Sequence, residues 1–239
     1  MNPTMTTRDP DRVLPALLFA LTAVTGLVDA VSYLSLGHVF TANMTGNVVF
    51  LGFALASAPD LSVARSGAAL AAFAAGALVA GRTVARIGTG PRLRWASNGF
   101  TIEAMLLLFA AAAAVGAGDD LLRHPARLYA LIFLTGTAMG VRNAVVRKLG
   151  ERDLTTTVLT LTITGIAADS SFAGGSNPGW TRRASSVALM FGGAAAGTWL
   201  LRHSLVVPIA CAGVLSAICA IAARICTRQA MVDAPQKFS

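Results

Sequence analysis

Apolar segments close to the length of a membrane-spanning helix recur along the whole chain. About 20 apolar residues are needed to cross the hydrocarbon core of a bilayer as a helix. Because 55% of the residues are hydrophobic and only 13% are charged, the chain lacks the polar surface that a soluble domain of this length needs. The short alternating strands of a membrane barrel do not occur in the sequence. We therefore expect an all-α fold, a polytopic transmembrane helical bundle.

The apolar segments differ in length. The long ones cover residues 14–36, 64–84, 100–117, 128–146, 185–201 and 205–223. Two others, 48–58 and 154–168, are short, and the first would make only about 16 Å of helix. We expect one transmembrane domain over residues 13–223, with polar tails at 1–12 and 224–239.

The first break in the apolar pattern lies within residues 28–47, VDAVSYLSLGHVFTANMTGN. An apolar segment that carries Asp29 is followed there by the polar residues Asn43, Thr45 and Asn47. Unsatisfied backbone in hydrocarbon is costly, so a polar patch at this depth needs a partner. Its amide and hydroxyl groups could coordinate a cation or bind a small polar solute. The alternative is that they satisfy the backbone at a helix break.

Asp29 lies about two thirds of the way along its apolar segment. A lone carboxylate at that depth is expected to be protonated or paired, which makes Asp29 a candidate proton or cation site. The alternative is that the helix ends early and Asp29 only caps the polar patch.

The two halves of the chain, about 14–118 and 127–223, resemble each other. A displacement of 114 positions aligns Asp29 with Asn143 and Thr41 with Thr155. Both halves then have a long helix, a short polar-then-apolar piece, an Ala/Gly-rich helix and a final helix. Such repeats are common in secondary transporters. We therefore expect Asn143, Thr155 and Thr157 to form the second half of a shared site.

Arg142 stands beside Asn143, within an apolar segment, and an arginine keeps its charge at any ordinary pH. We expect it to bind an anion, either Asp29 or a substrate. The alternative is that it extends to the lipid headgroups, as Arg147 nearby can. Glu103 lies near the start of its segment, which suggests an interfacial position.

The basic residues indicate a topology. If the two short segments re-enter without crossing, one side holds Arg8, Arg12, Arg82, Arg86, Arg92, Arg94, Arg147, Lys148, Arg152, Arg182, Arg183, Arg224, Arg228 and Lys237. The other side then holds only Arg65, Arg123, Arg127 and Arg202. If both short segments cross, the two sides are almost equal. The positive-inside rule favours the uneven division, with six spans, inverted halves and both termini in the cytoplasm. An eight-span bundle remains the alternative, because the sequence does not settle whether 41–58 and 153–170 cross.

Several functions are disfavoured. The formal charge of +8 sits in clusters between apolar segments and does not form a nucleic-acid-binding stripe, so we expect no nucleic-acid partner. The sequence contains no CxxC pair, no ligand cluster at metal spacing, no phosphate loop and no nucleophile elbow. We expect no cofactor, no metal and no enzymatic activity. The sequence excludes neither a monomer nor a homo-oligomer.

Three stretches resemble the YoaK-like family of bacterial integral membrane proteins, whose function is unknown. They are GLVDAVSYLSLGHVFTANMTGN at 26–47, GVRNAVVRKLG at 140–150 and DLTTTVLTLTITGIAAD at 153–169. The likeness extends over about residues 14–223. It implies a helical bundle in the bacterial inner (plasma) membrane and no established substrate. This chain has Arg142 where a glutamine is common in the family.

Two functions fit these observations. The first is a small secondary transporter or channel in the lipid bilayer, for an unidentified small solute or ion. Its expected binding residues are Asp29, Asn43, Thr45, Asn47, Arg142, Asn143, Thr155 and Thr157. The second is a non-transporting membrane scaffold or accessory subunit. The sequence does not indicate the substrate, the direction of transport or the coupling ion.

Overall fold

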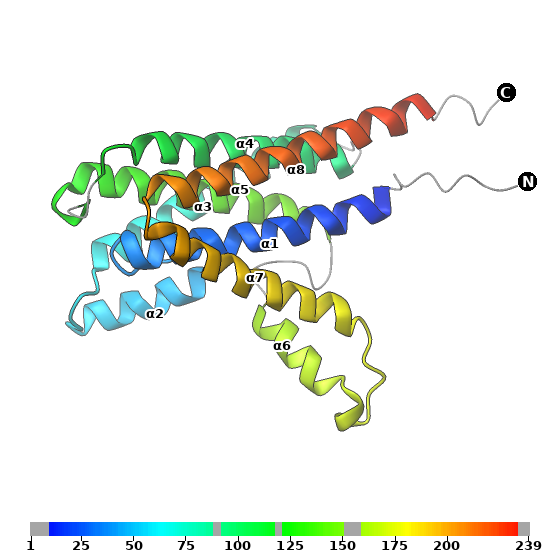
Figure 1. Cartoon of the computed structure of the whole chain (residues 1–239), viewed down its shortest axis with the longest axis horizontal. Coiled ribbons are helices and arrows are strands. Elements are labelled where there is room, and N and C mark those ends of the chain that lie inside the picture. The colour runs from blue at the N-terminus through cyan, green and yellow to red at the C-terminus, as the bar shows by residue number, and fades with distance from the viewer. Residues whose placement is uncertain (1–9, 88–91, 118–120, 151–158, 234–239) are drawn as a thin grey trace, which may run out of the picture.

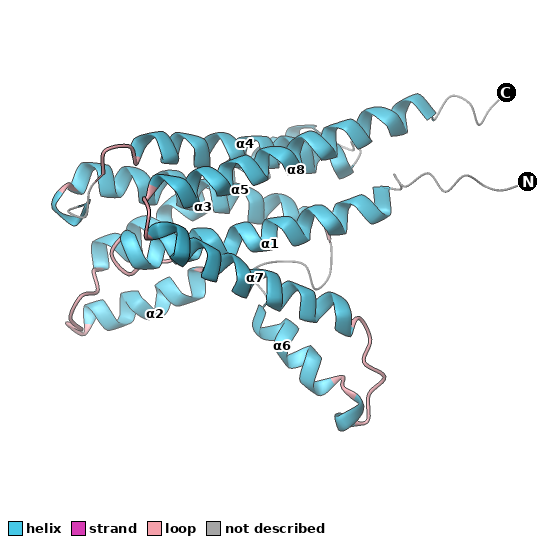
Figure 2. Ribbon diagram, in the orientation of Figure 1, coloured by secondary structure: helices cyan, strands magenta, loops and turns pink. Residues whose placement is uncertain are grey.

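The computed structural model describes residues 10–87, 92–117, 121–150 and 159–233, and the regular structure in these ranges is helical (Figure 2). The α-helices are α1 Pro10–Ser35, α2 Met44–Leu55, α3 Val63–Ile87, α4 Arg92–Ala113, α5 Pro125–Leu149, α6 Leu159–Ala168, α7 Trp180–Leu201 and α8 Val206–Asp233. Two single-turn helices, η1 Leu121–Arg123 and η3 Ser171–Ala173, lie in connections.

The helices fall into two length classes. Within the described ranges, six helices are long and apolar enough to cross a membrane: α1, α3, α4, α5, α7 and α8. The other two, α2 with 12 residues and α6 with 10, extend about 18 Å and 15 Å, which is too short to cross. The predicted fold class, a polytopic transmembrane helical bundle, is confirmed.

The long helices run alternately in opposite directions (Figure 1). We call the end of the bundle where α1 begins and α8 ends the terminal end, and the opposite end the far end. At the far end the chain turns back after α1, and α2 then starts inside the bundle and runs out to the far end. The helix α6 starts near the middle of the bundle's length, at its edge beside α7, and runs out to the terminal end (Figure 1). The two short helices therefore lead to opposite ends.

The packing partners repeat between the halves. The helix α1 packs against α7 and α8, while α5 packs against α3 and α4. The helix α2 packs against α3, α6 packs against α7, and α4 packs against α8. Exchanging α1 with α5, α2 with α6, α3 with α7 and α4 with α8 leaves this set of contacts unchanged. The main helix contacts are therefore the same in the two halves, although among the described residues α7 also packs against α8 and α3 has no equally extensive contact with α4.

Glycines at matching positions make this packing close. A Cβ atom added to Gly26 of α1 would lie 2.1 Å from a carbonyl oxygen of α7, and one added to Gly140 of α5 would lie 2.1 Å from a carbonyl oxygen of α3. The partner helices have glycines at these contacts too. A Cβ atom added to Gly193 of α7 would lie 2.1 Å from a carbonyl oxygen of α1, and one added to Gly76 of α3 would lie 2.2 Å from a carbonyl oxygen of α5. Only glycine allows backbones to approach this closely, a common device of membrane helix pairs.

Most helix boundaries lie within about five residues of those predicted, and two differ by more. The helix α4 begins at Arg92, before the predicted start at residue 100. The helix α8 continues to Asp233, past the predicted start of the polar tail at residue 224. Both extensions are polar, and arginine and glutamine are good helix formers. A change from apolar to polar sequence marks a membrane boundary, but it does not end a helix.

Candidate functional site within the membrane

The polar break after α1 is built from left-handed backbone. Gly37 and His38 have φ angles of 82° and 59°, a conformation that ends a helix and reverses the chain. The segment 39–43 then runs back beside α1 before α2 starts at Met44. Since α1 continues to Ser35, Asp29 lies inside the helix and not at its end.

Two side chains of α1 satisfy the returning backbone. The Asp29 carboxylate accepts a hydrogen bond from the Ala42 N–H at 3.1 Å. The Ser32 hydroxyl accepts one from the Thr41 N–H at 3.3 Å and donates to the Asp29 carbonyl oxygen at 3.2 Å. These bonds matter because lipid offers the backbone no replacement partner. Asp29 is therefore part of the framework of the break, besides being a candidate ligand.

Asn47 holds the same break from the other side. Its Oδ1 accepts a hydrogen bond from the Phe40 N–H at 2.9 Å, and its Nδ2 donates to the Phe40 carbonyl oxygen. The side chain is fully buried. Predicted as a possible ligand, Asn47 instead binds the backbone, because its amide supplies the donor and the acceptor that one extended residue needs.

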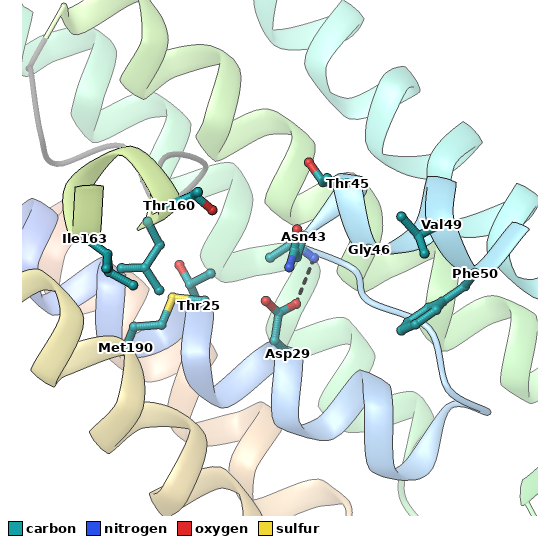
Figure 3. Close-up of a pocket in the computed structure, with 12 residues that line it drawn as sticks. Thr25, Asp29, Asn43, Thr45, Gly46, Val49, Phe50, Thr160, Ile163 and Met190 are labelled. Atoms are coloured by element: carbon teal, nitrogen blue, oxygen red, sulfur yellow. Dashed lines mark hydrogen bonds between the residues drawn. The ribbon is translucent and has the colours of Figure 1, made fainter. Parts of the chain in front are cut away.

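A cavity of about 410 Å³ opens beside Asp29 (Figure 3). It lies between α1, α2, α6 and α7. Its lining comprises Thr25, Asp29, Ala42, Asn43, Thr45, Gly46, Val49, Phe50, Leu159, Thr160, Ile163 and Met190. Mixed walls of this kind, apolar with a few polar groups, are typical of small-molecule sites.

Both short helices begin at this cavity. Asn43 precedes the first residue of α2 and Thr45 lies in its first turn, while Leu159 and Thr160 open α6. Asn43 makes no side-chain capping bond to α2. The first N–H groups of a helix lack partners within it and carry the positive end of the helix dipole. In several transporter folds, discontinuous helices meet at the substrate site in this manner.

The predicted residues divide into three groups. Asp29, Asn43 and Thr45 line the cavity, whereas Asn47, Arg142 and Asn143 do not. Thr155 and Thr157 lie outside the described residues. Asn143 is partly buried, and its Nδ2 donates to the Met139 carbonyl oxygen of its own helix at 2.8 Å.

Arg142 does not reach the headgroups, and its ion-pair partner is not Asp29. Its Nη1 lies 3.2 Å from Glu103 Oε1, and the two side chains are 1% and 0% exposed. The Ser216 hydroxyl donates to the same Glu103 oxygen at 2.9 Å. Glu103 is therefore central and not interfacial: because α4 begins at Arg92, this residue lies about three turns inside the helix.

Thr25 connects the ion pair with the cavity. Arg142 Nη1 donates to the Leu21 carbonyl oxygen at 2.8 Å, and Nη2 donates to the Thr25 hydroxyl at 2.7 Å. Thr25 also lines the cavity, one helical turn before Asp29. Thr25 was not predicted from the sequence, and Glu103 was predicted at the membrane interface. For Glu103 the available signal was a carboxylate in an apolar segment; a threonine in an apolar helix carries no such signal.

The fold and cavity define a multi-pass helical membrane protein in which two short helices start at a shared polar cavity. A family model described as a protein of unknown function (DUF1275) matches residues 17–222, and the chain belongs to that family. It is similar to the UPF0700 transmembrane protein YoaK of Bacillus subtilis (strain 168), with 35% identity over 158 residues. That match covers 65% of this chain and 66% of the relative, slightly less than two thirds of its length. No solved structure matches the chain.

Proposed function

We propose that the protein is a secondary transporter or channel for a small solute or ion, with the cavity beside Asp29 as its binding site. The observation that carries this proposal is the convergence of α2 and α6, which run to opposite ends of the bundle, on one polar cavity. A volume of about 410 Å³ lies within the usual range for small-molecule sites.

The contents of the cavity favour a small polar solute. Asp29, Asn43, Thr45 and Thr160 supply carboxylate, amide and hydroxyl groups. The first turn of α2 adds N–H groups and the positive end of its dipole. Donors and acceptors thus surround the same space. These groups suit binding better than catalysis. That the protein is not an enzyme stays a prediction.

The orientation proposed is that of the positive-inside rule. The uneven division of basic residues supports a cytoplasmic location for the terminal end. The likeness to a bacterial protein supports the bacterial inner membrane as the location. In this orientation α2 leads to the outside of the cell and α6 to the cytoplasm, as alternating access to one site requires.

A scaffold or accessory subunit is the second candidate. The observation that favours it is the use of Asp29, Ser32 and Asn47 as backbone partners, since these polar groups then need no ligand to explain their presence. Under this proposal the cavity has no cargo.

Flux into proteoliposomes separates the two. After a hyperosmotic step with potassium chloride, potassium acetate, potassium phosphate, urea or glycerol, light scattering reports solute entry, and trapped pyranine reports accompanying proton movement. We expect at least one solute to enter faster than into protein-free liposomes, and Asp29→Asn to slow its entry about tenfold or more, as loss of a charged hydrogen-bonding group does.

A matched pair on α6 serves as control. Thr160 lines the cavity, whereas Thr164, one turn further along, is exposed outside it. Thr160→Val should slow the same flux and Thr164→Val should not. If no solute enters faster than into empty liposomes, or if Asp29→Asn inserts normally and transports normally, the transport proposal is rejected. If Asp29→Asn fails to insert at all, the scaffold gains support.

A further inference from the structure

The buried charges inside the described bundle do not balance. Among the buried described residues, three carry ionisable charged groups: Asp29 at 6% exposure, Glu103 at 0% and Arg142 at 1%. Two acids and one base leave one negative charge without compensation. An unbalanced charge inside the hydrocarbon region is costly, so a positive partner is expected to accompany it.

Arg142 pairs with one acid and bonds a neighbour of the other. Its Nη1 pairs with Glu103 of α4 at 3.2 Å, while its Nη2 bonds Thr25 of α1 at 2.7 Å. Thr25 and Asp29 lie one turn apart on the same face of α1, and both line the cavity (Figure 3). Through Thr25, Arg142 is therefore linked to the face of α1 that carries Asp29.

The ion pair is incompletely satisfied. Glu103 Oε2 and Arg142 Nε are buried and have no hydrogen-bond partner. An ionised carboxylate ordinarily accepts hydrogen bonds at both oxygens, and a guanidinium has five N–H donors. An unsaturated pair is less tightly fixed than a fully bonded one. One oxygen of Glu103 therefore remains open to a proton.

We propose that Asp29 and Glu103 share one exchangeable proton, with Arg142 as the common counter-ion of whichever acid is ionised. The proton passes from hydronium in the cavity to a carboxylate oxygen, which leaves water and a neutral carboxylic acid. Arg142 keeps its charge throughout. Asp29 is the entry point, because it lines the cavity and Glu103 does not.

The surroundings favour a proton over a metal cation. Hydrogen-bond donors already occupy one oxygen of each carboxylate, which a metal cation would have to displace: the Ala42 N–H bonds Asp29 Oδ1, and Arg142 and Ser216 bond Glu103 Oε1. A sodium ion needs several converging oxygen ligands. The described residues contain no group of three or more His, Cys, Asp or Glu side chains that could hold a metal ion.

The remaining groups around the cluster leave the charge balance unchanged. The helix α8 contributes Ser216, which donates to Glu103, and the Cys219 thiol, which donates weakly to the Leu17 carbonyl oxygen at 3.9 Å. The helix α1 contributes Thr25. Each of these groups is neutral when it carries its proton, so the count of two acids and one base stands.

Use of this proton to couple transport rests on the proposed function, but its presence does not. Infrared spectroscopy of the purified full chain at pH 7, without added solute, measures protonated carboxyl groups by their C=O stretching band and its shift in heavy water. We expect one such group per chain. It should disappear in Asp29→Asn and also in Glu103→Gln, because each substitution leaves one acid to balance Arg142.

Asp60→Asn is the control, since Asp60 is exposed in the loop before α3 and its removal should leave the band intact. Absence of the band from the wild type, or its survival in Asp29→Asn or Glu103→Gln, would overturn the proposal. If one variant does not fold, the wild-type spectrum and the other variant still decide. The infrared band tests the shared proton and the flux experiment tests transport. Each result can fail without the other, so failure of this proposal and failure of the proposed function are distinguishable.

Discussion

At Asp29 the first half places a carboxylate on the cavity, whereas the matching position of the second half, Asn143, carries an amide that donates to the Met139 carbonyl oxygen of its own helix. Beside Asn143, Arg142 reaches across the bundle to Glu103. At Gly26 and Gly140, by contrast, the two halves make the same backbone contact at the same closeness.

The comparison separates what the fold requires from what a site uses. Backbones in contact accept only glycine, so the packing contacts stay alike in both halves. The residue type at a buried polar position is restricted only by the need for a partner, and an acid in one half can form an ion pair with a base in the other. The packing is therefore repeated, while the charge is not.

The largest effect is expected where the packing repeats. Adding a methyl group in Gly193→Ala forces α7 away from an α1 carbonyl oxygen that lies 2.1 Å from the new Cβ position. We expect a loss of about 4 kcal/mol or more in the free energy of unfolding, enough to remove the folded protein. The yield of monodisperse protein in detergent measures it.

The adjacent glycine provides the control. A Cβ atom at Gly192 would have nothing within 4 Å, so Gly192→Ala should give normal yield. In the other half, Gly76→Ala should behave as Gly193→Ala does, and Gly81→Ala, which also meets open space, as Gly192→Ala does. A tolerated Gly76→Ala would show that the packing of the two halves is not equivalent.

The next effect concerns the charges that do not repeat. Arg142→Gln leaves two buried acids without a counter-charge and should lower the free energy of unfolding by about 3 kcal/mol. Unfolding by sodium dodecyl sulfate in mixed micelles provides the measurement. Adding Glu103→Gln to this variant removes one acid and should restore about 1 kcal/mol or more. A double variant that is less stable than Arg142→Gln would contradict the arrangement.

A smaller effect is expected at the break between α1 and α2. Asn47→Ala removes two hydrogen bonds to Phe40 and leaves buried backbone groups unpaired, which should lower the free energy of unfolding by about 2 kcal/mol. Asn43→Ala, at an exposed side chain on the cavity, should change it by less than about 0.5 kcal/mol. Equal losses for the two variants would mean that Asn43 is structural as well.

Much of the fold follows from features that are local in the sequence. Segment length distinguishes α2 and α6 from the spanning helices, and the division of basic residues favours six spans. The sequence also predicts three cavity residues, because Asp29, Asn43 and Thr45 are polar groups in or beside apolar helices. These features depend on composition within a short window, so a single sequence reveals them.

The rest depends on partners that are distant in the chain. Glu103 was predicted at the interface because the apolar segment starts at residue 100, whereas α4 starts at Arg92. The polar first turns of α4 hid this longer helix, since arginine side chains can extend from a continuing helix to the interface. The partner of Arg142 could not be predicted, because two acids were available and only the packing of α4 against α5 selects Glu103. An asparagine that binds a ligand and one that binds backbone look the same in sequence, as Asn47 shows.

Accessibility of the first turns of α2 and α6 to water tests the central claim most directly. In a chain whose Cys211, Cys219 and Cys226 are replaced by alanine, Thr45→Cys and Thr160→Cys can be treated in proteoliposomes with a membrane-impermeant methanethiosulfonate. The account predicts that both cysteines react, and that a short bifunctional reagent links them when they are present together, while Thr198→Cys on the exposed face of α7 does not react. If Thr45→Cys and Thr160→Cys react only with a membrane-permeant maleimide, the cavity holds no aqueous path and the account is wrong.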